Sequence, residues 1–179
     1  MKKILLASMA LFLILSLSFA YGEWDPRDRA EEERQVKDTI SRLLSIDPSL
    51  QIYFDKAYAY AVLPTVGKGA FIGGVGYGRG WFFENGKAIG KVSITQLSAG
   101  AQIGGQAYRE IIFFRDKDRA DDFKNGRYEM GAQLSAIVVT EGVAKAGTYT
   151  DGVAVFILPT AGFMAEASVS GQRFSFEPF

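Results

Sequence analysis

Four glycines at every second position are the feature that most restricts how this chain folds. Gly74, Gly76, Gly78 and Gly80 lie within residues 71–83. In an extended strand this spacing places all four on one side. A side without Cβ atoms lets another backbone or a ligand approach closely and lets a sheet bend sharply. The spacing therefore predicts a strand of a strongly bent sheet, whose glycine side is either an open groove or buried by a helix.

The segments that follow predict a hairpin and further strands. Asn85-Gly86 tolerates the positive φ angles of a type I′ turn, so residues 84–87 are expected to join two antiparallel strands. Residues 116–124 predict a short charged helix that Asn125-Gly126 ends. Apolar runs predict further extended segments, with glycines as bend or bulge points. These segments are 87–115, 128–140, 152–158 and 163–176.

Before residue 57 the apolar residues follow a helical period instead. Val36, Ile40, Leu43 and Leu44 form one apolar stripe. The opposite side of this helix is acidic, whereas helices that lie on membranes usually carry Lys and Arg there. We therefore expect the stripe to pack on the protein's own sheet rather than on lipid. Asp47-Pro48 ends the helix and starts a short second one.

These patterns predict a single α+β domain over residues 21–179. Its core is a strongly bent antiparallel β-sheet or small barrel, flanked by an N-terminal amphipathic helix and short helices. Residues 21–56 are the N-terminal helical segment, and residues 57–179 are the glycine-rich β part.

Residues 1–20 are interpreted as a signal peptide. Lys2 and Lys3 precede an uncharged run that ends in Ser18-Phe19-Ala20, with small residues at both positions that a cut after Ala20 requires. An uncleaved membrane anchor is the alternative, although the run is short for a span. Cleavage predicts an exported, periplasmic protein, and secretion or membrane anchoring is the less favoured outcome.

The composition excludes several classes of function. The chain has neither Cys nor His, so it holds no disulfide, thiol nucleophile, Ser-His-Asp triad or imidazole metal ligand. Its 20 Lys and Arg residues balance 20 Asp and Glu residues, which argues against a nucleic-acid partner. The glycine spacing matches neither a dinucleotide-binding nor a phosphate-binding loop. We therefore expect no cofactor and no metal site.

Carboxylates are the remaining carriers of catalysis, as in a glycan hydrolase. Glu141, Asp151 and Glu166 lie in the strand-rich part, but the sequence alone brings no two of them together. Glu166 interrupts a mostly apolar strand, so by alternation it faces outward. An inward orientation would require a positively charged partner. The candidate partners are Arg79, Arg109 and Arg173.

Four blocks of sequence, in order, resemble the SYLF domain, also called the Ysc84-like domain. They are residues 59–64 with 69–74, residues 98–106, residues 111–114 before the short helix, and residues 162–171. The resemblance covers residues 35–176. It implies a lipid-binding module built on a small, strongly bent antiparallel sheet or barrel with flanking helices, and it brings no enzymatic activity.

The resemblance does not bring every ligand of the family to this chain. Eukaryotic members bind phosphoinositide membranes, some bundle actin filaments, and their lipid contact draws on a basic amphipathic N-terminal segment. Here a signal peptide and an acidic helix take that place. An exported protein meets neither actin nor phosphoinositides, so we expect a more general affinity for acyl chains or anionic head groups.

The leading hypothesis is therefore non-enzymatic binding of lipid or of an anionic membrane surface in the cell envelope. The candidate surface combines aromatic side chains with bases that meet phosphates. Its residues are Tyr77, Arg79, Trp81, Phe82, Phe83, Lys87 and Lys91. The competing interpretation places these aromatics in the protein's own core.

Two other classes of function remain as alternatives. The first is a structural or protein-interaction module of the envelope without a lipid ligand, marked by an exposed apolar patch and a stable oligomer. The second, more distant one is the carboxylate-based glycan hydrolase. The sequence names neither the lipid nor the oligomeric state.

Overall fold

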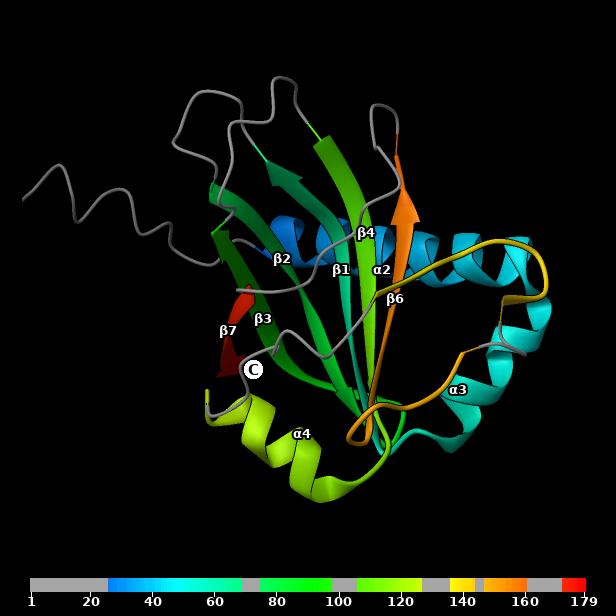
Figure 1. Cartoon of the computed structure of the whole chain (residues 1–179). Coiled ribbons are helices and arrows are strands. Elements are labelled where there is room, and N and C mark those ends of the chain that lie inside the picture. Colours follow the sequence, from blue (N-terminus) through cyan, green and yellow to red (C-terminus); the bar gives the residue numbers. More distant parts are fainter. Residues whose placement is uncertain (1–25, 69–74, 98–105, 127–135, 144–146, 161–171) are drawn as a thin grey trace, which may run out of the picture. The chain divides into compact units, whose positions relative to one another are not determined.

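Seven strands form one sheet in the computed structural model of the chain (Figure 1). The structure describes residues 26–68, 75–97, 106–126, 136–143, 147–160 and 172–179. Two compact units divide the chain, Met1–Glu33 and Arg34–Phe179, and the sheet belongs to the second. The elements are α2 (Pro26–Ile46), the 3-10 helix η1 (Pro48–Leu50), α3 (Gln51–Lys56), β1 (Ala59–Lys68), β2 (Val75–Glu84), β3 (Lys87–Leu97), β4 (Gln106–Phe114), α4 (Lys117–Lys124), β5 (Ala136–Val138), β6 (Val153–Pro159) and β7 (Gln172–Pro178).

The strand order is β5-β6-β4-β1-β2-β3-β7. Neighbours in this order pair antiparallel, except β5 and β6, which are parallel. Within the described residues β5 and β7 do not pair with each other, so the sheet is mixed and open rather than closed. The predicted α+β fold with a bent sheet and an N-terminal helix is confirmed. The parallel β5–β6 pair departs from the expected purely antiparallel sheet.

One side of the sheet, which we call the α2 side, is covered by residues 34–46 of α2 and by α3 (Figure 1). The predicted apolar stripe lies there. Val36 and Leu43 are fully buried, and Ile40 and Leu44 are partly buried against β1, β2, β4 and β6. The prediction that this stripe packs on the protein's own sheet is therefore confirmed.

The opposite side, which we call the α4 side, holds a second core. Phe123 of α4 contacts the rings of Phe82, Phe114 and Phe174, at centroid distances of 5.6, 4.8 and 4.8 Å. These three rings come from β2, β4 and β7. Three strands separate β4 from β7 in the sheet order, yet both reach the same helix residue. The sheet is therefore strongly bent toward the α4 side.

The glycine side of β2 is closed by the neighbouring strand. A Cβ atom at Gly80 would lie 1.9 Å from the Val62 carbonyl oxygen, and one at Gly78 would lie 2.7 Å from the Thr65 carbonyl oxygen. The register of β1 against β2 shifts between Val62 and Thr65, so β1 bulges toward the glycines. This side is thus neither an open groove nor covered by a helix at Gly78 and Gly80.

Local sequence signals set the turns and the Asp47 cap as predicted, and Asp116 adds a cap that was not predicted. The Asn85-Gly86 turn joins β2 to β3, with φ angles of 50° and 74°. Asp116 caps α4 by accepting a backbone N–H three residues later at 3.0 Å, and Gly126 follows the helix with a φ of 65°. Asp47 likewise accepts a backbone N–H at the start of η1, at 3.0 Å.

Some predicted segments lie outside the described residues. These are the signal peptide at 1–20, residues 71–74 with Gly74, residues 98–105, residues 128–135, and residues 163–171, which include Glu166. Among the helices that the structure describes, none combines the length and the apolar character needed to span a bilayer.

Candidate functional site

Tyr77 and Arg79 of β2 form the exposed centre of the predicted site. Tyr77 is 49% exposed, although Trp81 on the same side of the same strand is buried. The Arg79 side chain lies against Tyr77, with Nε 2.5 Å from the hydroxyl oxygen and the guanidinium carbon 5.6 Å from the ring centroid. An amphipathic ring beside a guanidinium suits a surface that meets anionic groups at a membrane interface.

The strand register brings further polar side chains beside this pair. Tyr77 pairs with Thr95 of β3, which pairs with Arg173 of β7. One rung along, Ser93 and Ser175 share a hydrogen bond of 2.6 Å between their hydroxyls. Side chains of paired residues point to the same side of a sheet. We call this surface the polar face. Its members are Tyr77, Arg79, Lys91, Ser93, Thr95, Arg173, Ser175 and the acidic Glu177, which pairs with Lys91.

Arg173 is the basic member of this face that sequence analysis did not assign to the surface. It alternates with the buried Gln172 and Phe174, and this alternation already indicates an exposed position. The signal does not show which strand lies beside it. That neighbour is β3, which is far away in the sequence.

The three candidate aromatics that follow Arg79 are much less accessible. Phe82 is fully buried on the α4 side, and Trp81 is 4% exposed on the α2 side, with its ring 5.1 Å from that of Phe179. Phe83 is half-buried and stacks on Tyr60 at 4.7 Å. For Trp81 and Phe82 the core interpretation describes their positions, whereas Tyr77 remains at the surface.

Lys87 does not join the polar face. The register of β2 against β3 shifts between Phe82 and Phe83, which leaves Ile89 as an extra residue in β3. Beyond this bulge Lys87 pairs with Glu84, whose side chain contacts α4. Lys87 is therefore exposed at the hairpin on the α4 side, while Lys91 stays on the α2 side opposite Trp81.

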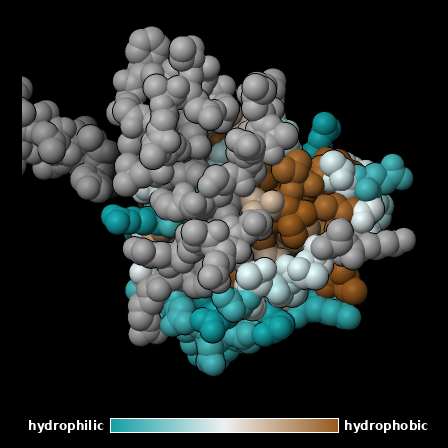
Figure 2. All heavy atoms as spheres, in the orientation of Figure 1, coloured by the Kyte–Doolittle hydropathy of each residue, from teal (hydrophilic) through white to brown (hydrophobic). Residues whose placement is uncertain are grey.

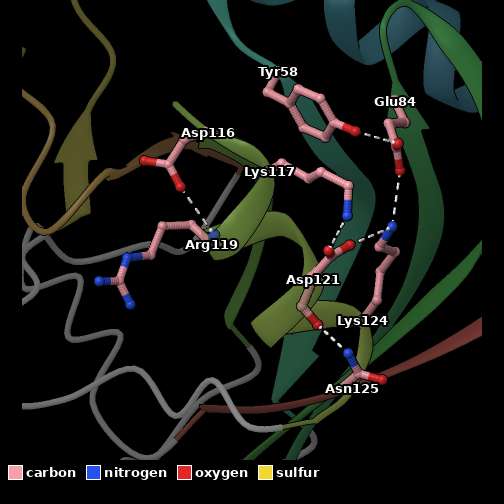
Figure 3. Close-up of polar contacts among 8 residues, drawn as sticks. All are labelled: Tyr58, Glu84, Asp116, Lys117, Arg119, Asp121, Lys124 and Asn125. Atoms are coloured by element: carbon pink, nitrogen blue, oxygen red, sulfur yellow. Dashed lines mark hydrogen bonds and ion pairs between the residues drawn. The ribbon is translucent and has the colours of Figure 1, made fainter.

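A second polar group fastens α4 to the sheet (Figure 3). Glu84 accepts hydrogen bonds from Lys124 Nζ at 2.8 Å and from the Tyr58 hydroxyl at 2.6 Å. Lys124 also contacts Asp121 at 2.9 Å, and Asp121 pairs with Lys117. The hydrogen bond from Lys124, followed by that from Tyr58, lowers the pKa of Glu84. The surface over α4 is correspondingly hydrophilic (Figure 2).

A third group is buried on the α4 side and was missed by sequence analysis. Glu110 is fully buried, with Gln172 Nε2 3.0 Å from its Oε2 and 3.3 Å from the Tyr108 hydroxyl oxygen. Burial, the largest cause, raises the pKa of Glu110 to about 8, while hydrogen bonds from Gln172 and Tyr108 act in the opposite direction. Glu110 directly precedes the apolar run 111–114, but the adjacent Arg109 makes this a weaker signal than the isolated charge of Glu166.

The carboxylates proposed for hydrolysis are not gathered in a cleft of the described residues. Glu141 lies exposed in a turn, and Asp151 lies exposed at a φ of 49° in the turn before β6. Glu166 lies outside the described residues. Nor does the described part of the chain hold a group of three acidic side chains able to bind a metal ion.

Comparison with known proteins gives two matches. Residues 95–178 match the family model described as "Ysc84: Las17-binding protein actin regulator". Beta cell expansion factor A of Aeromonas veronii is 30% identical over 152 residues, which cover 81% of this chain and 58% of that protein. The chain thus spans less than two thirds of the length of this relative. The family match takes in β4, α4, β6 and β7 and hence Arg173, Glu110 and Gln172.

Proposed function

We propose that this chain, which belongs to the Ysc84 (SYLF-domain) family, is a non-enzymatic protein that binds lipid or an anionic membrane surface. We further propose that it acts in the cell envelope after export through residues 1–20. The family description names actin regulation. That partner is not part of the proposal, since an exported protein does not meet actin filaments.

The observation that carries the proposal is the polar face. It sets the half-exposed ring of Tyr77 on one side of the sheet with three basic side chains, Arg79, Lys91 and Arg173. One acidic side chain, Glu177, lies on the same side and pairs with Lys91. Each base near an anionic leaflet contributes about 1 kcal/mol. Three such bases give weak, salt-sensitive attachment, to which interfacial burial of the Tyr77 ring adds.

Vesicle co-sedimentation at two salt concentrations tests the proposal. We expect the protein to bind vesicles of phosphatidylcholine with phosphatidylglycerol, and to bind less tightly as salt rises, because salt screens exposed charges. Vesicles of phosphatidylcholine alone should bind far less protein. Binding that ignores both charge and salt would contradict a surface mechanism and indicate acyl-chain insertion.

Matched single-charge variants localise the surface. Arg79→Gln and Arg173→Gln should each weaken binding about 5-fold, since about 1 kcal/mol corresponds to that factor. Lys87→Gln removes the same charge from the other side of the sheet and should leave binding unchanged. Equal losses in all three variants would mean that net charge, rather than the polar face, governs binding.

If the protein binds none of these vesicles, the membrane-binding proposal is wrong. The alternative would then be a protein-interaction module of the envelope, for which the oligomeric state and a protein partner are the next measurements.

A further inference from the structure

We propose that Glu110 forms a proton-dependent contact between β4 and β7. With a neutral carboxyl group it holds β7 across the α4 side of the sheet, and loss of the proton accompanies release of that strand. This inference concerns the interior of the sheet and stands independently of the polar face and of lipid binding.

The Glu110 contact joins two strands that are not neighbours in the sheet. β1, β2 and β3 lie between β4 and β7 in the sheet order. Nevertheless Gln172, the first residue of β7, reaches Glu110 at 3.0 Å and Tyr108 at 3.3 Å. All three side chains are at least 96% buried, since Tyr108 is the most accessible at 4%. This contact therefore depends on the bend of the sheet, and an opening of β7 would break it.

No charge in the described part of the chain compensates an ionised Glu110. The groups that influence its pKa are Gln172 and Tyr108, both neutral, and the effect of burial exceeds theirs. Across the strand pairs Glu110 stands opposite Leu63 of β1 and Ile157 of β6. Its Oε1 and the Oε1 of Gln172 are buried without a hydrogen-bond partner among the described residues. A carboxylate here would lack both a counter-charge and full hydrogen bonding, which is costly in an interior.

The direction of the pH effect follows from these surroundings. Below a pH of about 4.5, the ordinary value for this carboxyl, Glu110 is neutral whether β7 is closed or open. Between about 4.5 and about 8 the open form ionises while the closed form stays neutral, so the closed form loses relative stability. Above about 8 both forms are ionised, and the effect levels off. Release of one proton on opening gives up to a tenfold increase in the open population per pH unit.

β7 is the strand that this loss would free. It is an edge strand whose pairing in the described residues is with β3. Its other described supports on the α4 side are two ring contacts. Phe174 contacts Phe123 of α4 at 4.8 Å between ring centroids, and Phe176 contacts Phe82 of β2 at 5.5 Å. An edge strand held on one side opens at lower free energy than a central one such as β1. Opening would expose this part of the aromatic core.

Amide hydrogen exchange of β7 between pH 5.5 and 9.5, corrected for the intrinsic exchange rate, tests the proposal on the purified protein. We expect protection of residues 172–177 to fall by up to tenfold per pH unit up to about pH 8 and then to level off. Residues of β6 should keep their protection. A β7 response that stays flat from pH 5.5 to 8.5, or an equal loss in β6, would overturn the proposal.

Three variants separate Glu110 from other causes. Glu110→Gln keeps the shape but cannot ionise, so β7 protection should become independent of pH. Glu177→Gln, at an exposed position on the same strand, should keep the wild-type response. Tyr108→Phe removes a hydrogen bond that lowers the pKa of Glu110, so the response should persist and level off at a higher pH. The proposal fails if Glu110→Gln retains the wild-type slope, or if Tyr108→Phe folds and abolishes it.

Discussion

The two sides of β2 differ in how completely they are covered. On the α4 side Gly78, Gly80 and Phe82 are all buried, because β1 approaches the two glycines closely and Phe123 of α4 packs on Phe82. On the α2 side Trp81 is 4% exposed, whereas Tyr77, four residues earlier on the same side, is 49% exposed. Alternation assigns a residue to a side of the strand. Whether that side becomes core or surface depends on which element lies over it.

The largest expected effect tests the closed side. Gly80→Ala places a Cβ atom 1.9 Å from the backbone oxygen of Val62, and β1 cannot retreat without breaking its pairing. We expect the free energy of unfolding to fall by about 3 kcal/mol or more. Gly67→Ala is the control, because a Cβ there meets nothing within 4 Å. Urea denaturation measures both, and similar stabilities of the two variants would contradict the close approach.

Adjacent aromatic residues sharpen the comparison. Phe82→Ala removes a fully buried ring that contacts Phe114 and Phe123, and should cost about 3–5 kcal/mol. Phe83→Ala removes a half-buried ring on the other side and should cost clearly less. Equal losses would mean that the two sides are equally packed at this end of the strand.

Two glutamates on the α4 side should respond to pH in opposite ways. The pKa of Glu84 is lowered from its ordinary value of 4.5 by Lys124 and Tyr58, so its stabilisation is present at pH 7 and is lost as pH falls below that ordinary value. Glu84→Gln should therefore cost about 1 kcal/mol at pH 7 and little at pH 3.

The pKa of Glu110 is raised by burial, so its contribution is lost as pH rises from about 4.5 to about 8. Glu110→Gln should then gain stability relative to the wild type over that range. Denaturation midpoints of both variants measured from pH 3 to 9 check this. Curves with the same sign would show that one of the two environments is wrongly described.

We expect the smallest effect on stability from a substitution at Tyr77, in the exposed part of the α2 side. Tyr77→Ser should change the free energy of unfolding by no more than about 0.5 kcal/mol, because the side chain is half exposed. The same variant should weaken binding to anionic vesicles. Unchanged binding together with a large loss of stability would place Tyr77 in the core rather than in a binding surface.

Sequence analysis succeeded where a signal acts locally. The Asn85-Gly86 turn, the Asp47 cap of η1 and the apolar stripe of α2 all lie where the pattern predicted them. It placed one candidate site residue on the wrong side of the sheet, because a β-bulge adds one residue to β3. The period of two places Lys87 and Lys91 together, but the extra residue Ile89 moves Lys87 to the opposite side.

By itself, the sequence determined the type of each element and the sharp turns, because φ preferences, caps and apolar periods depend on neighbouring residues. Only the tertiary structure decided that β1 fills the glycine side of β2, that Arg173 joins Tyr77, and that Gln172 reaches Glu110. These contacts join residues far apart in the sequence. They depend on bulges and on the bend of the sheet, which arise from the packing of all strands together.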